Sequence, residues 1–104
     1  RGGRQGSVSG SVNLMNLGNV YGMLGDYEKK RSMLERALKI DETAYGPDHT
    51  SVAVTLTNLG NAYGSLGDYE KKRSMLERAL KINEAAYGPN HTSVAVTLTN
   101  LGIA

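Results

Sequence analysis

The chain carries one sequence twice. Residues 10–62 recur almost unchanged as residues 52–104, so that Tyr21 returns as Tyr63, 42 residues further along. A fixed period of about 20–50 residues is typical of solenoids, in which each unit buries its apolar face against the next unit. The repeat therefore predicts a stack of similar units. A residue that occurs in every unit is expected to serve the stack rather than a single catalytic site.

Ten positions distinguish the two copies, and most of them exchange small or polar residues. The pairs are Gly10/Val52, Ser11/Ala53, Asn13/Thr55, Met15/Thr57, Val20/Ala62, Met23/Ser65, Asp41/Asn83, Thr43/Ala85, Asp48/Asn90 and Asn61/Ile103. Four of these ten lie in the first residues of the first copy. Differences are expected there because a terminal unit has no neighbour to match on its outer side.

Size and composition exclude several classes of function. With 104 residues the chain has the length of one domain. It has no Cys, which excludes disulfides, thiolate nucleophiles and thiolate metal sites but does not decide the cell compartment. The net charge of +2 is too small to indicate a nucleic-acid partner. No apolar run approaches the roughly 18 residues of a membrane span, so no membrane association is expected.

The first helix of each unit is predicted from residues 50–66. Its apolar side chains are spaced by three and four residues, which places them on one helical face; they are Val52, Leu56, Leu59, Tyr63 and Leu66. Thr50 or Ser51 can cap its N-terminus, and Gly67 ends it. The counterpart in the first copy covers about residues 11–24, and a third copy of this helix starts at Thr92.

A second helix is predicted over residues 69–87. Asp68 can cap it, and Gly88 with Pro89 ends it. Its apolar residues form two overlapping stripes, which fits a helix packed between neighbours. The counterpart in the first copy covers about residues 26–45.

These helices define the predicted organisation of the chain. Residues 1–10 are expected to form a flexible arm rich in Gly, Ser and Arg, and their single R-G-G triplet is too little to predict RNA binding. Residues 11–51 form the first unit, residues 52–93 the second, and residues 94–104 a partial third unit with only its first helix.

The repeated sequence resembles the tetratricopeptide repeat. The resemblance lies in N-L-G-N-A-Y-G-S-L-G-D-Y at residues 58–69 and L-E-R-A-L-K-I at residues 76–82. The matching positions are Leu59, Gly60, Tyr63, Gly67, Asp68, Tyr69, Leu76 and Ala79. The period exceeds the roughly 34 residues of the common form. The linker at residues 87–95 is similar to that of the 42-residue variant found in kinesin light chains.

The resemblance implies an all-α solenoid, a right-handed superhelix of antiparallel helix pairs. It also implies a non-enzymatic scaffold whose first helices line a concave groove that binds protein or peptide segments. One departure from the family is that Lys30 and Lys72 stand where a small residue usually lies, opposite Gly18 and Gly60. We expect each Lys to lay its methylene stem across the helix contact and carry its ammonium to water.

Polar residues repeated along the first helices are the candidates for the groove. They are Asn16, Asn19, Asn58, Asn61, Asn100, Thr57 and Ser65, with Met23 nearby. An Asn amide both donates and accepts, so a row of them can hold an extended peptide backbone. The alternative is that some of these amides bond within the solenoid and fix the positions of its helices.

The remaining polar residues favour structural roles. The basic runs at residues 29–31 and 71–73 alternate with Glu, and Arg73 and Glu77 stand four residues apart, so a solvated face with ion pairs is expected. His49 and His91 have no partner nucleophile or ligand cluster in the sequence, so we expect them to fix loops. No catalytic, cofactor-binding or metal-binding residue is predicted. Asn90 begins an N-x-T triplet, a candidate glycosylation site.

The last predicted helix ends without a following helix. Its apolar residues are candidates for contacts between chains; they are Val94, Val96, Leu98, Leu101 and Ile103. Three alternatives remain open at this end: a covering helix, a cut inside a longer array, or docking onto the first helix of another copy. Docking of that kind does not close on itself, so it builds a homo-oligomer or a filament. Self-assembly is therefore the alternative to peptide binding.

Overall fold

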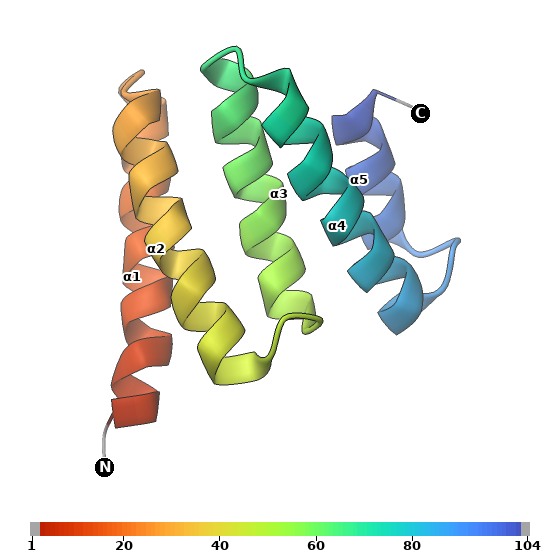
Figure 1. The fold of residues 1–104 in the computed structure, drawn as a ribbon, viewed down its shortest axis with the longest axis horizontal. Helices are drawn as coiled ribbons and strands as arrows, with labels where there is room; N and C mark the ends of the chain where they lie inside the picture. Colours follow the sequence, from red (N-terminus) through yellow and green to blue (C-terminus); the bar gives the residue numbers. More distant parts are fainter. Residues whose placement is uncertain (1–2, 103–104) are drawn as a thin grey trace.

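The described part of the chain consists of five helices. The computed structural model describes the backbone of residues 3–102 and the side chains of residues 10–102. The helices are α1 (Gly3–Met23), α2 (Tyr27–Tyr45), α3 (Thr50–Ser65), α4 (Tyr69–Tyr87) and α5 (Thr92–Leu101). They follow one another in space as in the sequence, each packed on the next, so that the molecule grows as a row of helix pairs (Figure 1). The predicted all-α fold with paired helices is confirmed.

Helix α1 begins earlier than the sequence suggested. It starts at Gly3, so it includes most of the segment expected to be a flexible arm. At Gly10, where the described side chains begin, α1 lies against α2, since a Cβ placed there would be 3.9 Å from Cδ1 of Ile40. Extending a helix that has already formed costs less than starting a new one, because each further residue adds one backbone hydrogen bond. Residues 1–2 of the predicted arm lie outside the described residues.

Histidines cap α3 and α5, in place of the expected Thr50 or Ser51. The Nδ1 atom of His49 accepts a hydrogen bond of 3.0 Å from the backbone N–H of Ser51. The imidazole also stacks on Tyr45, with ring centroids 4.5 Å apart. His91 repeats both contacts, with Ser93 and Tyr87. The predicted loop-fixing role of the two His residues is thus confirmed in a specific form. Because α3 starts at Thr50, the predicted unit boundary between residues 51 and 52 falls inside its first turn.

Asp and Gly set the turns between the helices of each pair. Asp26 and Asp68 each accept a hydrogen bond of 3.2 Å from the backbone N–H three residues later, as expected of an N-cap. Gly67 ends α3 with a φ of +86°, a conformation that costs a residue with a Cβ but not Gly. These local signals define the short connections that force α3 and α4 to lie antiparallel.

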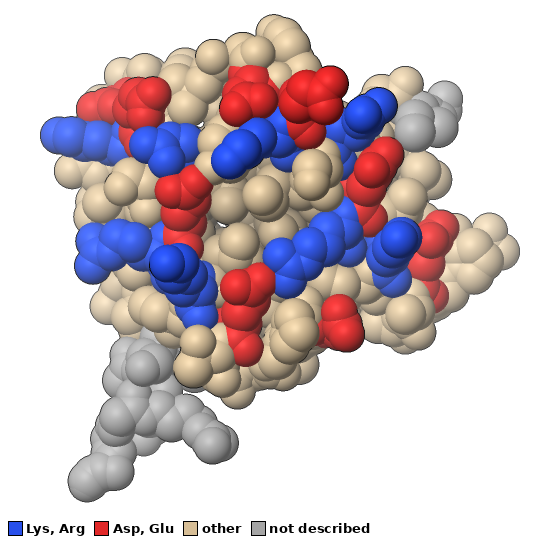
Figure 2. Space-filling view, viewed as in Figure 1, with Lys and Arg blue, Asp and Glu red and all other residues tan. Residues whose placement is uncertain are grey.

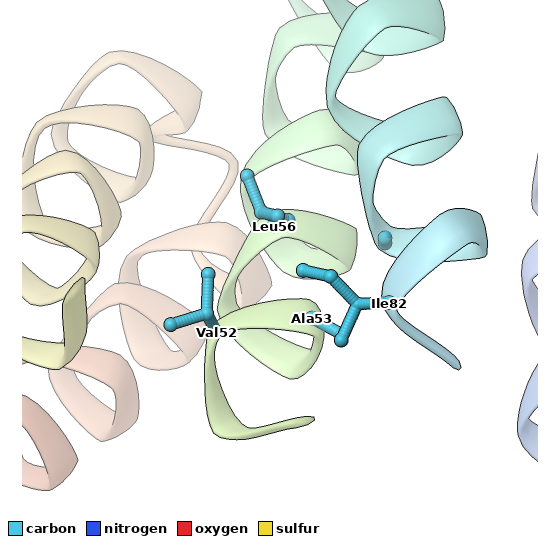
Figure 3. Close-up of a cluster of buried hydrophobic side chains, with 5 residues drawn as sticks. Val52, Ala53, Leu56 and Ile82 are labelled. Carbon is cyan, nitrogen blue, oxygen red and sulfur yellow. The ribbon is translucent and has the colours of Figure 1, made fainter. Parts of the chain in front are cut away.

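The apolar core is distributed along the row of helices. One cluster joins the two helices of the second unit and contains Val52, Ala53, Leu56, Ala79 and Ile82 (Figure 3). A second cluster joins the two units, because Leu34 of α2 packs with Leu59, Ala62 and Tyr63 of α3. The hydroxyl of Tyr63 donates to Glu35 of α2. Burial and this hydrogen bond raise the pKa of Tyr63 above its usual range. Each pair is therefore held by its neighbour.

Glycines allow the two helices of each pair to approach closely. A Cβ on Gly60 would lie 3.2 Å from Cγ of Leu76 and 3.3 Å from the carbonyl oxygen of Lys72. The Lys72 stem itself runs over Gly64, one turn further, where a Cβ would be 2.7 Å from its Cδ. Lys30 lies in the same way over Gly22. The expected stem contact is thus present, but it faces Gly22 and Gly64, and only the Lys backbone opposes Gly18 and Gly60.

Charged side chains gather on the face formed by α2 and α4. Lys and Arg alternate there with Asp and Glu (Figure 2). Arg31 pairs with Glu28 at 2.9 Å and with Glu35 at 2.8 Å, and Arg78 of α4 reaches Glu42 of α2 at 2.6 Å. Arg73 pairs with Glu70 instead of Glu77. The basic runs therefore belong to a mixed, solvated surface, and the first helices provide the other face of the molecule.

Candidate functional site

Two cavities open between the first helices of successive units. The first cavity, of about 170 Å³, lies between α1 and α3 and is lined by Ser11, Val12, Met15, Asp41, Tyr45, Ser51 and Val54. The second cavity, of about 340 Å³, lies between α3 and α5 and is lined by Thr50, Ser51, Ala53, Val54, Thr57, Asn58, Asn83, Tyr87, Thr92, Ser93, Val96 and Thr97. Both cavities lie beside the C-terminal ends of the second helices, α2 and α4.

The two cavities are the same site in successive units. Every residue that lines the first cavity has its counterpart, 42 positions later, in the lining of the second. Val12 corresponds to Val54, for example, and Tyr45 to Tyr87. Val54 belongs to both cavities, because it lies on α3, which borders the first cavity together with α1 and the second cavity together with α5. The groove is therefore a repeated element of the solenoid, and we call these two positions the first and the second subsite.

Each subsite has an apolar mouth and a polar floor. Val12 and Val54, at the mouth of the first cavity, are 54% and 55% exposed. At the floor, Asp41 in the first cavity and Asn83 in the second are only 4% and 7% exposed. An exposed apolar rim around a few buried polar groups is the usual composition of a site that binds a side chain or a small ligand.

Hydrogen bonds with side chains of the first helices hold the floor residues in place. Asp41 accepts from Ser11 at 2.6 Å through one oxygen and from Thr55 at 2.7 Å through the other. In the second subsite, the amide of Asn83 donates to Thr97 at 3.4 Å. Every buried side-chain nitrogen or oxygen of the described residues has a partner. The floors are therefore fixed before any ligand arrives.

The groove is almost free of charge. Helices α3 and α5 contain no Lys, Arg, Asp or Glu, and neither does α1 over residues 10–23. Asp41 is the one Asp, Glu, Lys or Arg among the described linings of the two cavities. Its field is not offset by neighbouring side chains of the groove.

The predicted groove residues divide between several places. Thr57 and Asn58 line the second cavity, and the amide of Asn58 also contacts the sulfur of Met15 at 3.6 Å. Asn100 lies at a separate hollow beside the N-terminal half of α4. Asn16, Asn19 and Ser65 are exposed, and Asn61 is half-buried. The structure therefore brings Thr57 and Asn58 together but does not gather the five Asn residues in one cavity.

The residues proposed for end contacts do not share one surface. Val94 is buried, and Val96 is exposed and lines the second cavity. Two residues apart in a helix point in nearly opposite directions, which is why these two cannot face the same neighbour. Leu98 and Leu101 are half-buried, and Ile103 lies outside the described residues. Asn90 is exposed in the turn before α5, so its glycosylation stays a prediction.

Sequence reasoning missed the floor and the mouth of the subsites. It selected Asn residues by their amides and overlooked Asp41, Tyr45 and Val54. A signal was present, because three of the ten differences between the copies fall in the cavity linings; they are Ser11/Ala53, Met15/Thr57 and Asp41/Asn83.

Within residues 10–102, no three His, Asp or Glu side chains gather closely enough to hold a metal ion. Of the described helices, none combines the length and the apolar character needed to cross a membrane.

Comparison with known proteins agrees with the geometry. No curated protein matches the chain. The model of the tetratricopeptide repeat family matches residues 11–85, which is most of the chain and covers most of both helix pairs. Paired antiparallel helices, the close Gly contacts and this match lead to one conclusion: the chain belongs to the tetratricopeptide repeat family.

Proposed function

We propose that this chain is a non-enzymatic interaction module that holds an extended segment of a partner protein in the groove between α1, α3 and α5. The observation that carries the proposal is the pair of subsites repeated 42 residues apart. An extended peptide also repeats its side chains at regular intervals, so residues several positions apart in one segment can occupy successive subsites. Family membership supports a protein partner in general.

Two features of the groove support peptide binding. The apolar mouths at Val12, Val54 and Val96 provide surface against which side chains of a partner can be buried. The amide of Asn58 in the second cavity offers a donor and an acceptor to a peptide backbone.

We also infer from the 42-residue period and the linker at residues 87–95 that the repeats are of the kinesin-light-chain type.

Substitution of Val54 tests the groove, because this residue belongs to both subsites. Val54→Arg is expected to abolish binding of peptides selected on the wild-type chain from a phage-displayed library of random decapeptides. The long side chain fills the mouths of both cavities, and Val54 is exposed, so the core is untouched. Binding is measured by fluorescence anisotropy with the selected peptides.

Thr43→Arg is the matched control, since it adds the same charge at an exposed position of α2 outside both linings. It is expected to leave binding unchanged. Retained binding in Val54→Arg, or a library that yields no binder, contradicts the proposal.

Self-assembly through the ends is the second candidate function. It is favoured by apolar positions that are exposed on the end helices but buried in α3: Leu17 of α1 corresponds to Leu59, and Ala95 of α5 to Ala53. However, inside the stack both of these positions are covered by a second helix. Leu59 packs on α2, and Ala53 clusters with residues of α4. Joining two copies end to end would instead place α5 against α1, a contact between two first helices.

Sedimentation velocity separates the two candidates. We expect a sedimentation coefficient that does not change with concentration, because the end faces do not complement each other in the way that α2 and α3 do. A coefficient that rises steadily with concentration would favour self-assembly, because head-to-tail contacts do not close.

A further inference from the structure

The difference between the two subsites is concentrated at their floors. Asp41 in the first subsite becomes Asn83 in the second, and Ser11, one of its two hydrogen-bond donors, becomes Ala53. The other partner position keeps a hydroxyl, which donates to Asp41 as Thr55 in one unit and accepts from Asn83 as Thr97 in the next. The charge and the additional donor that supports it thus change together. The two floors are alternative, internally consistent arrangements of one site.

Asp41 keeps acceptor capacity that the protein does not use. Each carboxylate oxygen has about two acceptor positions, and each is occupied here by one hydroxyl. Both donors are neutral, and within the described side chains no ion pair includes Asp41. A carboxylate buried without a cation is energetically costly. A ligand that supplied a positive charge to this floor would lower that cost.

The shape of the first cavity selects the kind of cation. Its mouth is formed by Val12, Val54 and Tyr45, and its charge lies at the buried floor. A Lys or Arg side chain has the matching order, with an apolar stem that ends in a charge. The volume of about 170 Å³ is half that of the second cavity, where Thr57 replaces the longer Met15.

We propose that the first subsite binds a Lys or Arg side chain of the bound segment through Asp41, and that the second subsite takes an uncharged side chain. This inference rests on the proposed function of the groove, and it adds a partner chemistry: an extended segment with one basic residue and one uncharged residue set apart by the repeat spacing. The charged floor determines which end of the groove receives the basic residue, so it also fixes the direction and register of the segment.

Paired peptides that differ only in the cation test the proposal. The probes are fluorescein-labelled decapeptides of Ser, Gly and Leu in which each position in turn is Lys, and a matched set with norleucine, which has the same stem without the ammonium. Anisotropy titrations with the wild-type chain are expected to show one register in which the Lys peptide binds roughly tenfold more tightly than its norleucine twin, as a charge-assisted hydrogen bond implies.

The repeat itself supplies the variants. Asp41→Asn gives the first floor the residue that the second already carries, and is expected to reduce the Lys/norleucine ratio to about one while norleucine peptides still bind. Asn83→Asp is expected to create a second register that prefers Lys. Asp48→Asn removes the same charge in an exposed loop, where the second copy also has Asn, and is expected to keep the tenfold ratio.

The outcomes distinguish this inference from the function on which it rests. If Lys and norleucine peptides bind the wild type equally, or if Asp41→Asn keeps the ratio, the cation subsite is wrong while the peptide groove stands. If neither set binds, the groove proposal fails and the subsite fails with it. Thermal unfolding of each variant, followed by circular dichroism, shows that the comparison is made on folded protein, and Asn83→Asp provides the reverse test if Asp41→Asn does not fold.

Discussion

Leu59→Ala is expected to lower the free energy of unfolding by about 2–5 kcal/mol, as removal of a buried Leu side chain usually does. Leu17→Ala, at the same position of the preceding unit, is expected to lower it by less than about 1 kcal/mol, since substitutions at exposed positions have small effects. Leu59 is 1% exposed and packs with Leu34 and Tyr63, whereas Leu17 is 43% exposed.

The comparison isolates the contribution of the neighbouring unit. Both Leu residues stand in the sequence N-L-G-N within a first helix, so their helix propensity and local contacts are closely alike. The two Leu residues differ in their neighbours. Helix α2 covers the side of α3 that carries Leu59, while within the described residues no helix covers the corresponding side of α1. Urea unfolding followed by circular dichroism measures both variants. Equal losses of stability would mean that the stack is not held between units.

The repeated architecture could be predicted from the sequence because its causes are local. The spacing of Leu56, Leu59 and Tyr63 defines a helical face. Gly67 ends one helix, and Asp68, the next residue, caps the start of the following helix. Repetition of those signals every 42 residues then requires neighbouring pairs to pack in the same way. The structure confirms these helices to within a residue or two for α2, α3 and α4.

The first turns of the helices could not be predicted as well. Thr50 and Ser51 are good capping residues by type, but His49 caps α3 because its ring is held by stacking on Tyr45. That stacking depends on the path of a loop, which residue preferences do not describe. Likewise, the composition of residues 1–10 suggested an arm, whereas α1 continues back to Gly3, because extending a formed helix costs less than starting one.

The candidate site was predicted only in part because it depends on the spacing between helices. Its residue type identifies Asn58 as a side chain that can bind a peptide. However, the spacing of α1, α3 and α5 determines which side of α3 is left open. The subsites take their floors from the ends of α2 and α4, at Asp41 and Asn83. These residues belong to the second helices, whereas the sequence interpretation sought the groove residues only on the first helices.

Gly60→Val is expected to lower the free energy of unfolding by about 3 kcal/mol, the upper part of the usual range for an overpacked core. A Cβ at this position already lies 3.2 Å from Leu76 and 3.3 Å from the backbone oxygen of Lys72, and the two further methyl carbons of Val have no room. Leu76 is fully buried, and the carbonyl belongs to α4 itself. Relief of the clash therefore requires α3 and α4 to separate, which opens the core cluster that contains Leu56.

Gly64→Val is the matched control, and it is expected to change stability by less than about 1 kcal/mol. Its nominal clash is closer, at 2.7 Å, but the atom it meets is Cδ of Lys72, in a flexible side chain that can swing into water. Both substitutions also gain the few tenths of a kcal/mol by which Val exceeds Gly in helix propensity. Urea unfolding compares them directly. A larger loss for Gly64→Val than for Gly60→Val would show that the Lys72 stem, and not the close contact between helix backbones, determines how α3 and α4 pack.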